Sequence, residues 1–326
     1  MLSSGSQNIL EVKDFEVSVT TKRGIGRAVD GISFTLKAGE TLGLVGESGS
    51  GKTLTSLAIL GLQPQPAAQI TGGQVLFRGD DLLKKTPSEL RHYRGRRIGM
   101  VLQDPMTALN PVFSIGRQLY EPLQLHRHLS GRALREQAIE LLRLLQISSP
   151  EIRLKSYPHQ LSGGIRQRVV GAIALSCSPE ILIADEPTTS LDVTVQAHYL
   201  ALLNAIQKRT GTAILFITHD FGVVARMCDR VAVMYAGRIV ETAPARQIFE
   251  QPAHPYTVAL LKSVPDLTKP VDHLPSIQGS PPSIYNRPQG CSFAPRCSHV
   301  MTKCRETYPP ETRLSKSHVA SCWRCE

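Results

Sequence analysis

The sequence has few aromatic residues, no long apolar run and no sign of a leader peptide. Aromatics make up 5% of the 326 residues, and they are not interleaved with basic residues as in a groove that stacks nucleic-acid bases. No stretch approaches the ~18 apolar residues that a membrane-spanning helix needs. Residues 1–15 lack both the basic region and the apolar core of a secretory signal. We therefore expect a protein that is made and kept in the cytosol.

The charge balance is basic, with 37 Lys and Arg against 27 Asp and Glu and a net charge of +10. This balance suits nucleic acid, an anionic membrane surface or a polyphosphate substrate equally well. The most basic stretch, residues 84–97, holds six basic residues and one acidic residue. Because stacking aromatics do not alternate with this charge, it predicts a solvent-exposed face or a contact with a partner, and no nucleic-acid partner is expected.

Apolar, β-rich runs predict buried parallel strands at residues 41–45, 181–184 and 213–217. Each run is followed by polar or glycine-rich residues and then by a helical pattern. This alternation indicates an α/β core with a parallel sheet. Residues 9–19 and 29–36 alternate more like antiparallel strands.

The helical patterns and the prolines predict how the chain is divided. Apolar spacing predicts a helix over residues 132–146, within a helical subdomain inserted at about 112–160. Periodic segments end after Leu261, and residues 264–295 hold seven of the 22 prolines. We therefore place a domain boundary near Pro265, between a domain of residues 1–264 and a tail of residues 265–326, which is short enough to need a staple such as metal.

A glycine-rich motif follows the strand at 41–45 and opens a helical run over residues 53–62. It matches G-x-x-x-x-G-K-[ST] in full, with Gly46, Glu47, Ser48, Gly49, Ser50, Gly51, Lys52 and Thr53. Successive backbone N–H groups of such a loop cradle phosphate oxygens, and the helix N-terminus adds partial positive charge. Lys52 can reach the β- and γ-phosphates, and the Thr53 hydroxyl can ligate Mg²⁺. A turn that merely caps a helix is the weaker interpretation, so we expect a nucleotide site.

Two adjacent acids, Asp185 and Glu186, end the strand predicted at 181–184. A buried strand that delivers Asp to its C-terminal edge suits a second Mg²⁺ anchor. Glu186 would then lie beside the γ-phosphate, where it can orient or deprotonate water. An acidic pair that simply ends a strand at the surface is the alternative, and the phosphate-binding motif makes it less favoured.

Four more short motifs, taken with these two, resemble the ATP-binding subunits of ABC transporters. They are Leu161-Ser162-Gly163-Gly164 as the signature motif, Gln103 as the Q-loop glutamine, Ser190-Leu191-Asp192 as the D-loop and His219 as the switch histidine. Their order and spacing agree with the family over residues 9–250. The resemblance implies an α/β P-loop NTPase fold of ABC type, with an antiparallel β subdomain, an inserted helical subdomain and a small Cys-rich C-terminal extension.

The resemblance also implies a role for each motif. Ser162, Gly163, Gly164 and the D-loop with Asp192 would contact nucleotide across a pair of subunits that face head to tail. Gln103 would join Thr53 and Asp185 around Mg²⁺ and relay the nucleotide state to membrane subunits. Glu186, His219, Gln103 and Lys52 would be the catalytic residues, with His219 stabilising transition-state charge. Taken alone, the signature turn is an ordinary helix N-cap and His219 a structural histidine.

The sequence departs from the family pattern at the residues that would contact the adenine base. The family usually stacks an aromatic side chain on adenine from the loop after the first strand, but residues 17–27 contain none. Val19 or Ile25 would provide an apolar contact in its place.

Longer sequence segments resemble one branch of this family in particular, the oligopeptide/dipeptide importers, a branch that also includes nickel importers. They are residues 103–111, 157–161 and 254–261, and a tail whose residues 286–291 and 295–297 are similar to the branch's C-terminal extension. The nickel relatives generally lack such a tail, so peptide is favoured over nickel.

Five of the seven cysteines crowd the last 36 residues, at Cys291, Cys297, Cys304, Cys322 and Cys325. In a cytosolic chain this cluster favours metal over disulfides. The spacing C-x5-C-x6-C-x17-C-x2-C does not match the paired zinc pattern, whereas four thiolates spread over loops suit a [4Fe–4S] cluster. The resemblance implies Cys291, Cys297, Cys304 and Cys322 as its ligands, with Cys325 a spare or a substitute for Cys322. Zinc and unligated thiols remain the alternatives.

The leading hypothesis is thus an ATPase subunit that binds ATP and Mg²⁺ and energises import of di- and oligopeptides. It would lie peripherally on the cytoplasmic face of the bacterial inner membrane. Its expected partners are a second, related ABC ATPase subunit, two membrane permease subunits and, indirectly, an extracytoplasmic peptide-binding protein. The rivals are nickel or other solute import, a soluble ABC-type ATPase that acts on nucleic acid, and a redox-sensing interaction protein.

Overall fold

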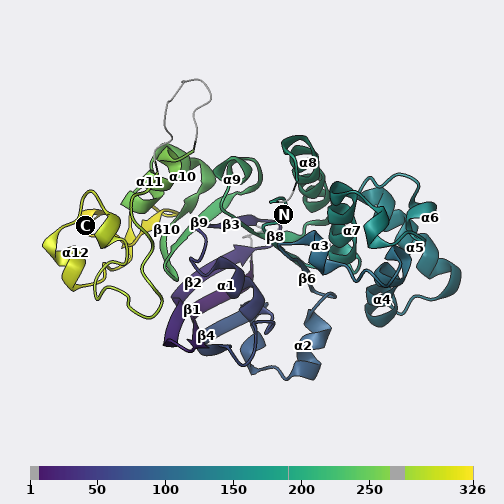
Figure 1. Cartoon of the computed structure of the whole chain (residues 1–326), viewed down its shortest axis with the longest axis horizontal. Helices are drawn as coiled ribbons and strands as arrows, with labels where there is room; N and C mark the ends of the chain where they lie inside the picture. The colour runs from purple at the N-terminus through teal and green to yellow at the C-terminus, as the bar shows by residue number, and fades with distance from the viewer. Residues whose placement is uncertain (1–6, 190, 265–275, 326) are drawn as a thin grey trace, which may run out of the picture. The chain divides into compact units, whose positions relative to one another are not determined.

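The computed structural model describes residues 7–189, 191–264 and 276–325, which fall into two compact units (Figure 1). Unit 1 contains Gln7 and residues 37–40 and 84–216. Unit 2 contains residues 8–36, 41–83, 217–264 and 276–325. The phosphate-binding motif and the cysteine-rich tail therefore belong to the same unit.

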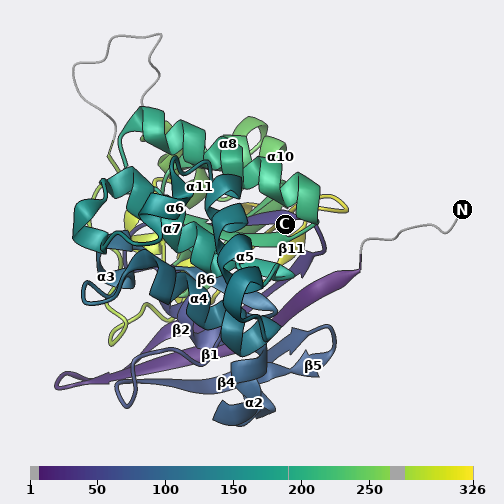
Figure 2. The ribbon, with the colours of Figure 1, turned by 90° about the vertical axis from the view of Figure 1, so that its right-hand side faces the viewer.

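A four-stranded sheet in unit 2 has the order β2-β1-β4-β5. Its strands are β1 (Asn8–Thr21), β2 (Gly24–Lys37), β4 (Ala68–Phe77) and β5 (Asp80–Asp81) (Figure 2). β4 pairs antiparallel with both β1 and β5. The strands predicted at residues 9–19 and 29–36 are confirmed, and each is longer than its alternating pattern indicated.

The second sheet of unit 2 runs in the order β11-β12-β10-β9-β3. Its strands are β3 (Thr41–Val45), β9 (Arg230–Tyr235), β10 (Arg238–Pro244), β11 (Thr312–Arg313) and β12 (Val319–Ala320). β3 and β9 are parallel, while β10, β11 and β12 continue the sheet antiparallel. Two short strands of the tail thus extend the sheet that carries the phosphate-binding motif.

Short helices accompany this second sheet. They are α1 (Lys52–Ile59), α9 (Phe221–Met227), α10 (Ala245–Glu250), α11 (Pro255–Lys262) and α12 (Thr302–Glu306), with 3-10 turns η3 (Ala294–Arg296) and η4 (Trp323–Cys325). Phe293 of the tail is buried in one hydrophobic cluster with Val45, Tyr235 and Tyr256. Apolar burial of this kind anchors the tail to the sheet.

Unit 1 combines the strands β8-β7-β6 with most of the helices. β6 (Ile98–Val101) and β7 (Ile181–Asp185) are parallel, and β8 (Ala213–Thr218) follows in the order, its last two residues being counted with unit 2. The helices are α2 (Pro87–Tyr93), α3 (Pro105–Ala108), α4 (Ile115–Arg127), α5 (Gly131–Leu144), α6 (Pro150–Arg153), α7 (Gly163–Leu175) and α8 (Val193–Thr210), with the 3-10 turn η2 (Pro158–Gln160). The 3-10 turn η1 (Leu82–Lys84) has its first two residues in unit 2 and its last in unit 1. The three predicted strands exist as β3, β7 and β8, and parallel pairing is confirmed for β3 and β7.

The predicted helices exist, but both end earlier than their apolar patterns indicated. The helix expected over residues 132–146 is α5, which stops at Leu144 because Gln146 takes a left-handed backbone conformation with φ 54°. The helix expected over residues 53–62 is α1. This helix ends at Ile59. Gly61 has a φ of 63°, and its N–H donates a hydrogen bond to the carbonyl of Ala58, as in a glycine C-cap.

The predicted domain boundary at Pro265 lies outside the residues that the structure describes. The stretch of basic residues at 84–97 contains α2, which starts at a capping box of Thr86 and Glu89 and buries none of its residues. Across the described ranges, no helix combines the length and apolarity that crossing a membrane requires.

An arginine cluster around Asp30 ties the tail to the four-stranded sheet. The Asp30 carboxylate, 8% exposed, accepts from Arg27 at 3.1 Å, from Arg238 at 2.6 Å and from Arg287 of the tail at 2.7 Å. Burial alone would raise the pKa of Asp30, but hydrogen bonds from Arg238 and Arg27 outweigh it and lower that pKa. The ionised carboxylate therefore stabilises the fold above its unfolded pKa of about 4, and this contribution is lost as pH falls.

We expect Asp30→Asn to lower the free energy of unfolding at pH 7 by about 1.5–3 kcal/mol, because three arginines lose the carboxylate that they share. Urea unfolding measures this loss, which should shrink as pH falls below about 4. Glu250→Gln, which removes the partner of Arg246 in an exposed pair, should leave the free energy of unfolding close to that of wild type. Equal stability of Asp30→Asn and wild type at pH 7 would contradict the assignment.

Candidate functional site

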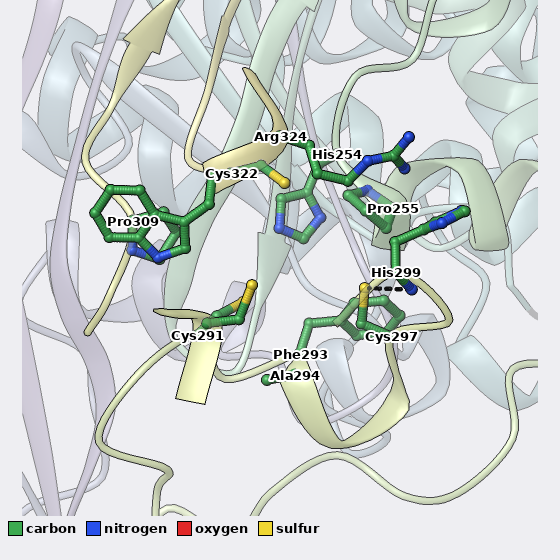
Figure 3. A pocket seen from close by; sticks show the side chains of 12 residues that line it. His254, Pro255, Cys291, Phe293, Ala294, Cys297, His299, Pro309, Cys322 and Arg324 are labelled. Carbon is green, nitrogen blue, oxygen red and sulfur yellow. Dashed lines mark hydrogen bonds between the residues drawn. The ribbon is translucent and has the colours of Figure 1, made fainter. Parts of the chain in front are cut away.

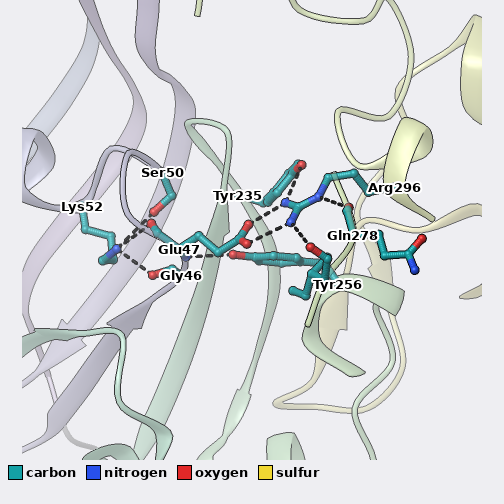
Figure 4. A network of polar contacts seen from close by, with 9 residues as sticks. Gly46, Glu47, Ser50, Lys52, Tyr235, Tyr256, Gln278 and Arg296 are labelled. Atoms are coloured by element: carbon teal, nitrogen blue, oxygen red, sulfur yellow. Dashed lines mark hydrogen bonds and ion pairs between the residues drawn. The ribbon is translucent and has the colours of Figure 1, made fainter. Parts of the chain in front are cut away.

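Residues 46–51 of the motif form a loop between β3 and α1, and Lys52, the first residue of α1, turns its side chain into this loop (Figure 4). The Lys52 ammonium donates to the carbonyls of Gly46 at 2.7 Å and Glu47 at 2.9 Å. It also lies 3.4 Å from the Ser50 hydroxyl. Lys52 is 5% exposed, while Ser48, Gly49 and Thr53 are exposed. The loop therefore presents backbone and hydroxyl groups to solvent around a buried cation, as phosphate binding requires.

Two glycines of this loop are required by close approach. A Cβ at Gly46 would overlap the backbone oxygen of Met234, and one at Gly51 would overlap that of Ala28. Gly51 is also the residue before α1 and has φ 105°, which side chains rarely adopt. The first and last glycines of the motif are therefore needed for the loop to pack closely against the neighbouring backbone.

The acidic residues lie at the end of β7 in unit 1. Asp185 is 1% and Glu186 9% exposed. Glu186 has a left-handed backbone, φ 44°, a strain that often marks functional positions. Its carboxylate accepts from the Gln103 amide at 3.0 Å and from the Thr189 hydroxyl at 3.1 Å. The structure therefore brings together two residues that the sequence analysis selected separately.

The signature residues open α7 in unit 1. Ser162 is the residue before the helix, and its side chain makes no capping hydrogen bond. Ser162 and Gly163 are exposed, and a Cβ on Gly163 would meet no atom within 4 Å. Gly164 approaches Val195 of α8 closely. The simple helix-cap interpretation therefore leaves the Ser162 hydroxyl unexplained.

The other motif residues lie at helix starts and strand ends. Asp192 caps α8 by accepting from the Val195 amide at 2.9 Å, while Ser190 of the same motif lies outside the described residues. His219 is exposed and directly follows β8, in unit 2. Each unit thus contributes its own set of motif residues. Unit 2 holds residues 46–53 and His219, and unit 1 holds Gln103, Ser162–Gly164, Asp185, Glu186 and Asp192.

An aromatic residue of the tail lies beside the segment expected to contact the base. Ile25 is 71% exposed, in keeping with an available apolar surface. The Tyr285 hydroxyl is 2.6 Å from the Thr21 hydroxyl, and Ile284 lies against Gly26. Tyr285 could not be recognised from the sequence, because no local pattern connects residues that are 264 positions apart.

The four cysteines selected from the tail line one pocket of unit 2 (Figure 3). Cys304 and Cys322 are buried, and Cys291 and Cys297 are partly buried. The backbone amide of Cys291 donates to the backbone carbonyl of Cys304 at 2.8 Å, and this hydrogen bond joins the segments of chain around these two cysteines. Cys325 is not a lining residue; the other residues that line the pocket are His254, Pro255, Phe293, Ala294, His299, Pro309, Trp323 and Arg324.

All seven cysteines are free thiols. Burial raises the pKa of Cys291 to about 11, and the neighbouring Cys304 and Cys322 add to the effect. Burial also raises the pKa of Cys297 and of Cys322. Within the ranges that the structure describes, no three His, Cys, Asp or Glu side chains are grouped so that they could hold a metal ion.

Two family models match the chain. The model described as ABC transporter matches residues 29–189, and the one described as oligopeptide/dipeptide transporter, C-terminal region, matches residues 240–304. The first covers the phosphate-binding loop and the acidic strand, and the second covers three of the four pocket cysteines.

Curated relatives match over nearly the full length. A probable peptide ABC transporter ATP-binding protein, y4tR, of Sinorhizobium fredii is 50% identical over 97% of this chain and 95% of its own. The dipeptide transport ATP-binding protein DppD of Bacillus subtilis has the same values. The oligopeptide transport ATP-binding protein OppD of Salmonella typhimurium is 46% identical over 97% of this chain and 93% of its own.

Solved structures share the fold. A dimeric, post-hydrolysis structure of the ATP-binding cassette MJ0796 bound to ADP and Pi has a TM-score of 0.66 at 27% identity, covering 73% of this chain and 99% of that one. CbiO1 from Clostridium perfringens, part of the ABC transporter complex CbiONQ, has a TM-score of 0.62 at 28% identity, covering 75% and 91%.

The fold, the phosphate-binding loop and these matches define an ABC ATPase, and the chain belongs to the family of ABC transporter ATP-binding proteins. Within that family it belongs to the oligopeptide/dipeptide transporter branch. The predicted family and branch are thereby confirmed.

Proposed function

We propose that this chain hydrolyses ATP to energise the import of di- and oligopeptides through a separate membrane permease. The observation that carries the proposal is near full-length similarity, at 50% identity, to proteins named for peptide and dipeptide transport. A complete phosphate-binding loop and an acidic strand end supply the parts that hydrolysis needs. Nickel import is the less favoured assignment, because the tail matches the oligopeptide/dipeptide model.

The residue roles follow from chemistry and placement. The backbone of residues 46–51 and the Lys52 ammonium would hold the β- and γ-phosphates. Thr53, Gln103 and Asp185 would hold Mg²⁺, which supplies charge neutralisation of the phosphates when bound. Oxygen donors of this kind are what Mg²⁺ prefers.

Glu186 would orient water and accept its proton as the γ-phosphate is attacked. The amide of Gln103, 3.0 Å away, holds the Glu186 carboxylate in place. His219 would stabilise transition-state charge from an exposed position after β8. Ser162, Gly163, Gly164 and Asp192 would act on the nucleotide of an opposing subunit, since the serine hydroxyl at the start of α7 is not used as a cap.

The proposed partners are a second ABC ATPase subunit, most simply a related sibling, and two permease subunits. A peptide-binding protein outside the membrane would deliver the substrate. The chain would then work peripherally on the cytoplasmic face of the cell membrane.

Deleting its gene should abolish uptake of labelled di- or oligopeptides and leave nickel uptake intact. Loss of nickel uptake alone would overturn the peptide assignment.

We also propose that residues 265–326 form an extension that carries a [4Fe–4S] cluster on Cys291, Cys297, Cys304 and Cys322. Support comes from the position of these four cysteines in the lining of one pocket of unit 2, although the described side chains are not grouped there so as to hold a metal ion. The spacing of these four cysteines does not match the paired C-x2-C zinc pattern, and four thiolates spread over loops suit an iron–sulfur cluster. When bound, the cluster would staple a small tail that has little core of its own.

Anaerobically purified wild type is expected to show the visible charge-transfer absorption of an iron–sulfur cluster, with iron and sulfide by chemical analysis. Cys297→Ser should lose most of it, because one iron loses its thiolate. Cys325→Ser should keep it, as should Cys177→Ser in unit 1. Zinc in place of iron, or an unchanged spectrum in Cys297→Ser, would refute this ligand set.

A further inference from the structure

The phosphate-binding loop is held by an arginine of the cysteine-rich tail (Figure 4). Arg296 Nη1 donates to Glu47 Oε2 at 2.7 Å, and Nη2 donates to Oε1 at 3.0 Å. This is a bidentate pair, the strongest arrangement between these two groups. Arg296 is 4% and Glu47 26% exposed, so the pair is largely shielded from water.

The guanidinium is fixed on its other sides as well. Its Nε donates to the Gln278 carbonyl at 3.0 Å and Nη2 donates to the Ile277 carbonyl at 3.1 Å. Nη1 lies 3.3 Å from the Tyr235 hydroxyl. A planar group with this many partners has one orientation, so it can fix the Glu47 carboxylate and not merely neutralise it.

Glu47 connects this arginine to the phosphate-binding lysine. Its side chain meets Arg296, its carbonyl accepts from Lys52 at 2.9 Å, and its amide donates to the Tyr256 hydroxyl at 2.9 Å. An unneutralised carboxylate at this position would repel a triphosphate chain and leave the loop free to reorient. The Arg296 charge removes both effects.

Arg296 is also rigidly joined to the cysteine pocket. It ends the turn η3 (Ala294–Arg296), and Cys297 follows directly. Phe293, which lines the pocket, packs against the rings of Tyr235 and Tyr256, both at 5.3 Å. A shift of the pocket wall therefore moves the guanidinium and the aromatic rings that support Glu47.

We propose that Arg296 is a positioning residue for ATP, which orients and neutralises Glu47 and thereby couples the cysteine-lined pocket to the phosphate-binding loop. The inference uses the nucleotide binding of the family and holds whether the pocket contains iron, zinc or free thiols. Because coupling between two sites is reciprocal, bound nucleotide must in turn stabilise the pocket wall.

Arg296→Gln is expected to weaken binding of a fluorescent ATP analogue to the full chain about tenfold, because Glu47 then faces the phosphates uncompensated. In the assembled transporter, the KM for ATP should rise by a similar factor while kcat stays within about twofold, as expected when binding is weakened equally in the ground state and the transition state. Arg296→Lys should recover part of the affinity. Arg246→Gln, which breaks an exposed pair of the same 2.7 Å length, should bind as wild type.

The double variant Glu47→Gln/Arg296→Gln separates positioning from general stability. Removing the uncompensated carboxylate should restore affinity to within about threefold of wild type, the non-additive result expected of a coupled pair. Wild-type affinity in folded Arg296→Gln would overturn the proposal. So would a double variant that binds no better than Arg296→Gln alone.

A measurement on the wild-type chain tests the coupling even if these variants fail to fold. Hydrogen exchange in the presence of Mg²⁺ and ATP should slow at residues 292–298, where the amides of Ala294, Arg296 and Cys297 are hydrogen-bonded. Residues 311–316 around β11, on the same tail, should not change. Unchanged exchange at 292–298 with nucleotide bound would contradict the proposal.

Discussion

Replacing Glu186 by glutamine is expected to lower ATP hydrolysis on the order of 10²–10⁴-fold while ATP still binds. Glutamine keeps the size of the side chain, and its carbonyl can still accept from the Gln103 amide, now 3.0 Å from Glu186 Oε2. What is lost is the negative charge that orients and deprotonates water. The left-handed backbone at Glu186 and the contact from Thr189 hold either side chain in the same place.

Steady-state phosphate release from the assembled transporter measures the loss, and ATP trapping by the same sample shows that binding persists. Glu140→Gln, an exposed acid on α5 paired with Arg143, serves as the matched charge-removing control. It should hydrolyse ATP as wild type does. A Glu186→Gln transporter that turns over at the wild-type rate would show that another group activates water.

Replacing Lys52 by alanine is expected to weaken ATP binding by about 10–100-fold, which also removes hydrolysis at ordinary ATP concentrations. Lys52 is 5% exposed and its ammonium lies inside the loop, so its charge acts on the phosphates with little screening by water. The affinities for ATP and for ADP should both fall, because the charge acts on phosphate oxygens and not on the base.

Calorimetric titration with ATP tests this prediction. Lys262→Ala, at the exposed end of α11, is the control for loss of one positive charge. Because Lys52 also ties the Gly46 and Glu47 carbonyls together, thermal unfolding of both variants must be compared. Full ATP affinity in folded Lys52→Ala would contradict the assignment of the phosphate site.

The motif residues could be predicted from the sequence because their chemistry lies in consecutive positions. In Gly46–Thr53, glycine spacing, backbone donors and the lysine are all encoded within eight residues, and the structure places them in one loop after β3. The cysteines were more difficult. Their crowding predicted a common site, and four of them line one pocket, but spacing alone could not choose a ligand.

The contacts between the tail and the nucleotide loop could not be predicted. Arg296 and Glu47 are 249 positions apart, and Arg287 and Asp30 are 257 apart. Such pairs depend on how β12 joins β10 and how Phe293 enters the core, which no local pattern encodes. The predicted ends of the helices were wrong for a related reason. A residue with a left-handed backbone, such as Gln146, ends a helix even where the apolar periodicity of the sequence continues.

The central claim is tested most directly by uptake into proteoliposomes that contain the permease, both ATPase subunits and the loaded peptide-binding protein outside. With Mg²⁺ and ATP enclosed, wild type should accumulate labelled di- or oligopeptide, and accumulation should stop when this chain carries Glu186→Gln. ADP in place of ATP should give no uptake. Equal accumulation with wild type and Glu186→Gln, or hydrolysis by wild type without any peptide uptake, would contradict the account.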